Sequence, residues 1–151
     1  MTVTILDPNT ALIVADLQNG IASLPSAHPM DGVVRRVAAL TDVFRSRGLP
    51  VVLVNVAGGA PAPGAFTNTG LEAHLRALEV TQVVIAGVAT SNGVEVTARQ
   101  AYELGFNVTL AIDAMTDLQA DAHAYSVARI FPRIGETGAT QDIIDLLEQR
   151  A

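Results

Sequence analysis

One sequence feature constrains the fold of this chain most. It is an unbroken apolar run that is followed by small residues and then by a helical pattern. Residues 83–88 are all small or apolar, which is typical of a parallel strand buried on both faces. Small and polar residues follow at 89–93, and Val94, Ala98 and Ala101 then recur at helical spacing. A strand that leads directly into a helix leaves backbone N–H groups without intrahelical partners. Together with the helix dipole, these donors predict a site for an anion or a developing oxyanion.

The same alternation of apolar strands and amphipathic helices runs through the whole chain. Strands are predicted at residues 11–15, 51–56, 83–88 and 106–112 with a short one near 133–136, and helices at about 31–47, 69–78, 93–104, 118–130 and 140–149. Near-continuous apolar strands separated by helices indicate a parallel sheet covered on both faces. We therefore expect one domain over residues 1–151, a Rossmann-like α/β/α sandwich around a mostly parallel five-stranded sheet.

The composition of the chain limits the classes of molecule that it is expected to bind. Half of the 151 residues are hydrophobic and 16% are charged, which favours a compact globular protein over a disordered one. The net charge of −6 without a basic cluster argues against nucleic acid and anionic membranes. No apolar run approaches the ~20 residues that span a bilayer. The N-terminus lacks a signal-peptide pattern, so a cytoplasmic location is expected.

The chain contains neither cysteine nor lysine. Disulfides and a thiolate nucleophile are therefore excluded, as is a lysine acid, base or anion anchor. The histidines His28, His74 and His123 are isolated in sequence, without metal-ligand spacing. The glycines form no phosphate-binding loop. We therefore expect no metal and no cofactor.

Candidate chemistry gathers where the predicted strands end, because ligands bind at the carboxyl edge of such sheets. Asp16 ends the first strand, where partial burial would raise its pKa and let it exchange protons near neutrality. Its alternative role is to accept N–H bonds from the following turn. Thr90, Ser91 and Asn92 have no base nearby in sequence, so helix capping by Ser91 or Asn92 is favoured over nucleophilic attack. Asp113 is expected to accept hydrogen bonds from its own turn.

Four segments together resemble the isochorismatase-like hydrolases, which include nicotinamidases, N-carbamoylsarcosine amidases and isochorismatases. Residues 16–18 resemble the D-[ML]-Q signature, and residues 64–71 resemble the S/G-A-F-x-x-T-x-L segment. Residues 87–98 resemble the G-V-x-T-x-x-C-V-x-x-T-A nucleophile turn, and residues 113–114 match the D-A after the next strand. The resemblance implies a catalytic Asp16, a dimer or higher assembly, and an oxyanion held by backbone N–H groups beside a cis peptide, here Val88–Ala89.

The chain departs from the family pattern at two catalytic positions. Gly93 stands where most members carry the nucleophilic cysteine. Isochorismatases also carry glycine there, since vinyl-ether hydrolysis needs acid chemistry from the aspartate rather than a covalent nucleophile. The family's lysine lies on a strand just before the S/G-A-F segment, but only about nine loop residues precede Phe66 here. That strand, its lysine and the metal cluster of nicotinamidases are therefore missing. Loss of this outer strand would leave a flavodoxin-like strand order.

The resulting hypothesis is a hydrolase that acts on a vinyl ether or an amide-type C–N bond of a small molecule, without a covalent intermediate. Its catalytic groups would be the Asp16 carboxyl and the backbone N–H groups of Ala89 and Gly93. The expected substrate-binding residues are Gln18, Asn55, Phe66, Thr90 and Asn92. The alternative is a catalytically degenerate member that binds a small ligand or serves in assembly. A flavodoxin-like nucleotide or flavin binder is a third possibility, which rests on topology alone. We expect a homo-oligomer, a dimer or tetramer, with no nucleic-acid or membrane partner.

Overall fold

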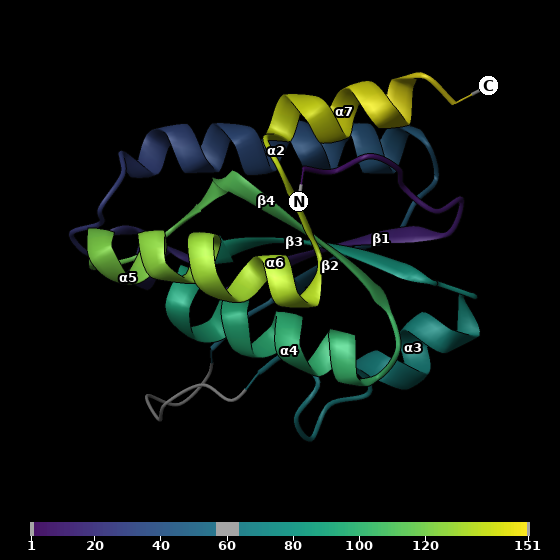
Figure 1. The fold of residues 1–151 in the computed structure, drawn as a ribbon, viewed down its shortest axis with the longest axis horizontal. Coiled ribbons are helices and arrows are strands. Elements are labelled where there is room, and N and C mark those ends of the chain that lie inside the picture. The colour runs from purple at the N-terminus through teal and green to yellow at the C-terminus, as the bar shows by residue number, and fades with distance from the viewer. Residues whose placement is uncertain (1, 57–63, 151) are drawn as a thin grey trace.

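Strands and helices alternate along the chain in a computed structural model that describes residues 2–56 and 64–150 (Figure 1). The strands are β1 (Thr10–Ala15), β2 (Val51–Val54), β3 (Gln82–Val88), β4 (Asn107–Thr116) and β5 (Glu136–Gly138). The α-helices are α1 (Asn19–Ala22), α2 (Met30–Ser46), α3 (Leu71–Ala77), α4 (Glu95–Glu103), α5 (Ala120–Tyr125), α6 (Phe131–Ile134) and α7 (Thr140–Glu148). Two π-helical turns, η1 (Thr90–Val94) and η2 (Ser126–Ile130), precede α4 and α6.

The five strands form one parallel sheet in the order β2-β1-β3-β4-β5. This is the flavodoxin-like order expected when the outer strand is missing. Ala15, the last residue of β1, pairs with Val54 on one side and with Gly87 on the other. The strand order therefore reverses between β1 and β3, and their carboxyl ends meet at the switch point where ligands bind in such sheets. The predicted fold class is confirmed.

Alternate residues of the strands feed two separate cores. In β1, Ala11 and Ile13 face a core formed with α3, α4 and α6, whereas Leu12 and Val14 face one formed with α2 and α7. Figure 1 shows the corresponding layers. Helices α2 and α7 lie on one side of the sheet, and α3, α4, α5 and α6 lie on the opposite side. This arrangement explains why the strands read as continuous apolar runs rather than as alternating patterns.

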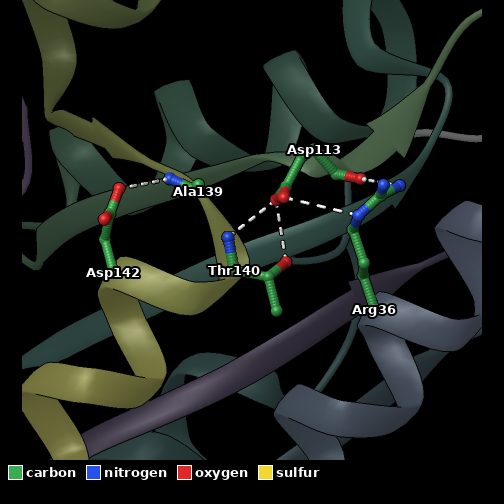
Figure 2. A network of polar contacts seen from close by, with 5 residues as sticks. All are labelled: Arg36, Asp113, Ala139, Thr140 and Asp142. Atoms are coloured by element: carbon green, nitrogen blue, oxygen red, sulfur yellow. Dashed lines mark hydrogen bonds and ion pairs between the residues drawn. The ribbon is translucent and has the colours of Figure 1, made fainter.

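The fourth strand extends further than the sequence predicts. It continues past residue 112 to Thr116, because Ala114 and Met115 are buried against the core. Asp113 therefore lies within the strand, and the expectation that its own turn supplies its hydrogen bonds is wrong. Its Oδ1 accepts bonds from the backbone N–H and the hydroxyl of Thr140, at the start of α7, at 2.7 and 2.8 Å (Figure 2). Its Oδ2 lies 3.4 Å from Nε of Arg36 on α2.

Two helix boundaries also differ from the predictions. Regular α-helix begins at Glu95 rather than at residue 93, since η1 occupies the turn after β3. The helix predicted to end at residue 130 continues through η2 and α6, so Arg133 is helical and the last strand begins only at Glu136. Of the loop predicted at residues 57–66, residues 57–63 lie outside the described residues. No helix within residues 2–56 and 64–150 has the length and apolar character needed to cross a membrane.

Candidate active site

Asp16 occupies the first position after β1, at the switch point of the sheet. Its backbone is left-handed, with φ of 51°, a conformation that aspartate tolerates better than most residues. Its N–H donates to the Val54 carbonyl at 2.8 Å, and its own carbonyl accepts a bond from the Gln18 N–H at 3.0 Å. The backbone bonds on both sides therefore fix the direction in which the carboxyl group leaves the strand.

The carboxyl group of Asp16 is buried and incompletely satisfied. The residue is only 7% exposed, and Oδ1 has no hydrogen-bond partner in the part of the chain that the structure describes. Burial raises the pKa of Asp16, because a charged carboxylate loses its hydration there. An unsatisfied buried carboxyl is costly in a folded protein, and such groups concentrate at functional sites.

The turn between β3 and α4 faces this carboxyl group. The Val88–Ala89 peptide is cis, as the family resemblance implies. The Ala89 carbonyl accepts bonds from the N–H groups of Asn92 and Val94, at 3.0 and 3.1 Å, which closes the turn. Gly93 is buried within it, and a Cβ atom added there would lie 2.8 Å from Oδ2 of Asp16. The Asp16 carboxyl group therefore lies directly beside Gly93, where a larger side chain would contact it.

A cavity of about 190 Å³ opens at this point. Its lining comes from the ends of β1, β2 and β3, from η1, and from the segments that follow β1 and β4: Asp16, Ile21, Leu24, Val56, Val88, Ala89, Asn92, Gly93 and Leu118. Among the described residues that line it, Asp16 is the one ionisable residue. A small molecule in the cavity would therefore meet a single carboxyl group in an otherwise largely apolar environment, where electrostatic interactions are strengthened.

The structure brings four of the eight predicted site residues into this cavity: Asp16, Ala89, Asn92 and Gly93. The Gln18 side chain instead holds the end of β2, accepting a bond from the Val56 N–H at 3.0 Å and donating to the Val56 carbonyl at 3.2 Å. It thereby fixes a wall of the cavity without lining it.

The remaining three predicted residues lie outside the cavity lining. Phe66 stacks on Phe106 with ring centroids 6.0 Å apart, beside the core under α3 and α4. Asn55 is exposed just after β2. Thr90 is fully buried, and its hydroxyl shares a hydrogen bond of 2.7 Å with Nδ1 of His123.

Sequence reasoning missed Asp117, which holds the turn in place from the end of β4. Its Oδ2 accepts bonds from the N–H and the hydroxyl of Ser91, at 2.8 and 2.6 Å. Ser91 is thus bound to Asp117. The prediction that Ser91 or Asn92 caps the helix is wrong, because the N-cap positions of η1 and α4 are Ala89 and Val94 and neither makes a side-chain capping bond. Burial opposes ionisation of Asp117, but the Ser91 bonds and the backbone N–H groups of Leu118 and Gln119 outweigh it, so the pKa of Asp117 is lowered.

Two further contacts attach η1 and α4 to the segment after β4. Besides the bond between Thr90 and His123, the Ser126 hydroxyl donates to Glu95 at 2.6 Å. His123 is distant from Thr90 in sequence, and only the fold reveals their contact. Asp117, in contrast, follows β4 as Asp16 follows β1, so correct placement of the strand end would have identified it.

The residues described in the structure contain no group of three or more His, Cys, Asp or Glu side chains placed to hold a metal ion. The arrangement at the switch point consists instead of one buried carboxyl group, a tight backbone turn and a small apolar cavity. A buried carboxyl group can exchange a proton with a molecule bound beside it, and backbone N–H groups of a tight turn can stabilise negative charge.

Comparison with known proteins agrees with this fold. The model of the isochorismatase domain matches residues 60–142, and the chain belongs to this family. It is 35% identical to the isochorismatase family protein YecD of Escherichia coli O157:H7, with 91% of this chain and 96% of YecD covered. YwoC of Bacillus subtilis is 29% identical, with 90% and 93% covered. An isochorismatase family protein from Burkholderia thailandensis has the same fold, with a TM-score of 0.87, 32% identity, and 96% and 98% covered.

The alignment with YecD is also longer than this chain. The alignment spans 182 positions, more than the 151 residues of this chain. YecD therefore contains residues that have no counterpart here.

Proposed function

We propose that this chain is an isochorismatase-family hydrolase that cleaves a small molecule without a covalent intermediate. Asp16 is its general acid and base, and the backbone N–H groups of Ala89 and Gly93 bind the oxygen that gains negative charge. One observation carries this proposal: the buried carboxyl of Asp16, with Oδ1 unpartnered among the described residues, faces Gly93 across a largely apolar cavity.

A vinyl ether is the first candidate substrate. Neutral Asp16 would donate its proton to the vinyl carbon that is not bonded to oxygen, which leaves an oxocarbenium ion. Water would then add to that cation and return a proton to the carboxylate, and the resulting hemiketal would separate into a carbonyl compound and an alcohol. The raised pKa of Asp16 supports this role because the acid must still hold its proton when substrate binds.

An amide or another C–N bond is the second candidate. Here the Asp16 carboxylate would take a proton from water, which attacks the carbonyl carbon. The N–H groups of Ala89 and Gly93 would stabilise the tetrahedral oxyanion, and Asp16 would pass the proton to the leaving nitrogen. Because Gly93 has no side chain, the attacking group in this route is water and no acyl-enzyme forms.

Turnover and mass spectrometry together test the proposal. Purified protein is incubated with a panel of small vinyl ethers, amides and ureides, and product release is measured by chromatography. The intact mass of the protein is recorded during turnover. We expect saturable turnover of at least one class, with the protein mass unchanged. The proposal would be contradicted if none of the classes were turned over, or if the protein mass increased by a substrate fragment.

A further inference from the structure

A second and larger cavity lies beside the first turns of α2, between that helix, β4 and α5. Its volume is about 430 Å³. Its described lining is His28, Pro29, Gly32, Arg35, Arg36, Ile112, Asp113, Met115 and His123. None of these described residues also lines the cavity at Asp16. The larger cavity is therefore a separate site, to which the proposed hydrolysis assigns no role.

The charges around this cavity favour an anion. Arg35 has no ion pair or hydrogen bond with any residue in ranges 2–56 and 64–150. Arg36 is paired with Asp113, but that carboxylate also accepts two bonds from Thr140 (Figure 2). The cavity therefore contains two guanidinium groups and one carboxylate, and that carboxylate is already bonded on both oxygens. An anion would supply the missing negative charge.

Two histidines complete the lining and leave nitrogen atoms for a ligand. The rings of His28 and His123 pack edge to face, with centroids 4.6 Å apart. Each uses Nδ1 on a threonine hydroxyl, His28 with Thr116 at 2.9 Å and His123 with Thr90 at 2.7 Å. Neither Nε2 has a partner among the residues that the structure describes. Where the threonine hydroxyl donates to Nδ1, the ring proton lies on Nε2, and Nε2 can then donate to a ligand.

We infer that this cavity binds a small oxyanion, a phosphate or a carboxylate, through Arg35, His28 and His123. The same histidine connects the cavity to the proposed active site, because His123 is bonded to Thr90 in η1. Thr90 lies three residues before Gly93, within the turn that carries the proposed N–H donors. An oxyanion bound to His123 therefore alters the environment of that turn without entering the Asp16 cavity.

Nuclear magnetic resonance of the ¹⁵N-labelled full chain tests this inference. Sodium phosphate and sodium acetate are titrated separately, with sodium chloride holding the ionic strength constant. We expect saturable shifts of the Gly32, Asp113 and Gly93 amide signals with one of the two anions. Saturation with phosphate assigns a phosphate site, and saturation with acetate alone assigns a carboxylate site.

Matched arginine variants separate specific binding from general charge attraction. Arg35→Gln should weaken binding about tenfold, because it removes a charged donor from the cavity. Arg45→Gln makes the same change on an exposed position of the same helix and should leave the affinity unchanged. Shifts that do not saturate with either anion, or equal weakening by the two variants, would overturn the inference.

Thr90→Val tests the connection to the active site. It removes the hydroxyl that bonds His123, and thermal melting without anion verifies that the variant folds. We expect the Gly32 signal to titrate as in the wild type while the Gly93 signal no longer shifts. A Gly93 signal that still titrates in folded Thr90→Val would overturn the proposed connection.

Discussion

Oδ2 of Asp16 lies 2.8 Å from the position that a Cβ atom on Gly93 would occupy. Real side-chain carbons rarely approach an oxygen so closely, so any larger residue at position 93 would force the carboxyl group to move. The carboxyl belongs to the first strand and the glycine to the turn after the third, and the parallel sheet places both at one point. Glycine at this position therefore allows the carboxyl its present orientation and leaves space beside it for a substrate.

Gly93→Ala should reduce catalysis while the protein remains folded. The backbone of residue 93 is not left-handed, so alanine introduces no backbone strain there. Its methyl group would displace the Asp16 carboxyl, and we expect kcat/KM to fall at least about tenfold, or about 1.4 kcal/mol in activation free energy. Steady-state kinetics measures the change. Gly70→Ala is the control, since a Cβ there meets nothing within 4 Å. Full activity in Gly93→Ala would show that this contact has no catalytic importance.

The stability gained by Asp16→Asn over the wild type should increase as pH rises. Because burial raises the pKa of Asp16 in the folded protein, the folded state binds more protons than the unfolded state above the ordinary value of 3.8. The wild type therefore loses stability as pH rises from 3.8 through the folded pKa, and asparagine has no such proton to lose. Urea unfolding at several pH values measures the difference.

The matched control for this comparison is Asp42→Asn, at an exposed position of α2. It should show no pH-dependent gain over the wild type. A stability difference between Asp16→Asn and the wild type that stays constant with pH would contradict a raised pKa for Asp16.

Ser91 and Asp117 should be energetically coupled. Ser91→Ala removes one of the two bonds to Oδ2, and Asp117→Asn removes the charge that both bonds stabilise. Each single variant should cost about 1–3 kcal/mol of unfolding free energy, and the double variant less than the sum by about 1 kcal/mol. Urea unfolding of the four proteins of this cycle gives the coupling energy. Strict additivity would indicate that Asp117 does not hold the turn through Ser91.

His123 should make the protein less stable in mild acid. Burial, and then repulsion from His28, lower its pKa, so the folded protein holds this ring neutral at pH values where the unfolded chain binds a proton. The wild type therefore loses stability as pH falls below about 6.5. His123→Gln should lose less between pH 7.5 and 5.5, measured by urea unfolding without phosphate. His74→Gln, on an exposed face of α3, should behave as the wild type. Equal losses in all three proteins would exclude His123 as the cause.

The layers and the carboxyl edge of the sheet follow from the sequence because burial determines them. Residues 11–15 and 83–88 are apolar throughout, as is typical of a strand that is covered on both faces. Asp16 and the 89–93 turn follow these runs directly, so their approach could be predicted from the topology alone.

The contacts that hold the turn could not be predicted in the same way. Asp113 has the polarity of a strand end, yet its partners Arg36 and Thr140 allow it to lie within β4. Because the sequence predicts that this strand ends at residue 112, it does not identify Asp117 as the residue that follows the strand. The contacts of His28 and His123 depend on side chains that are far apart in sequence and meet only in the folded chain.

The most direct test of the proposed chemistry is the turnover of Asp16→Asn on a substrate that the wild type hydrolyses. Asparagine preserves the shape of the side chain but can neither donate nor accept the catalytic proton. We expect kcat to fall at least about 100-fold, with the fold retained in the circular dichroism spectrum. Turnover by folded Asp16→Asn at the wild-type rate would contradict the role of this carboxyl group as the acid and base.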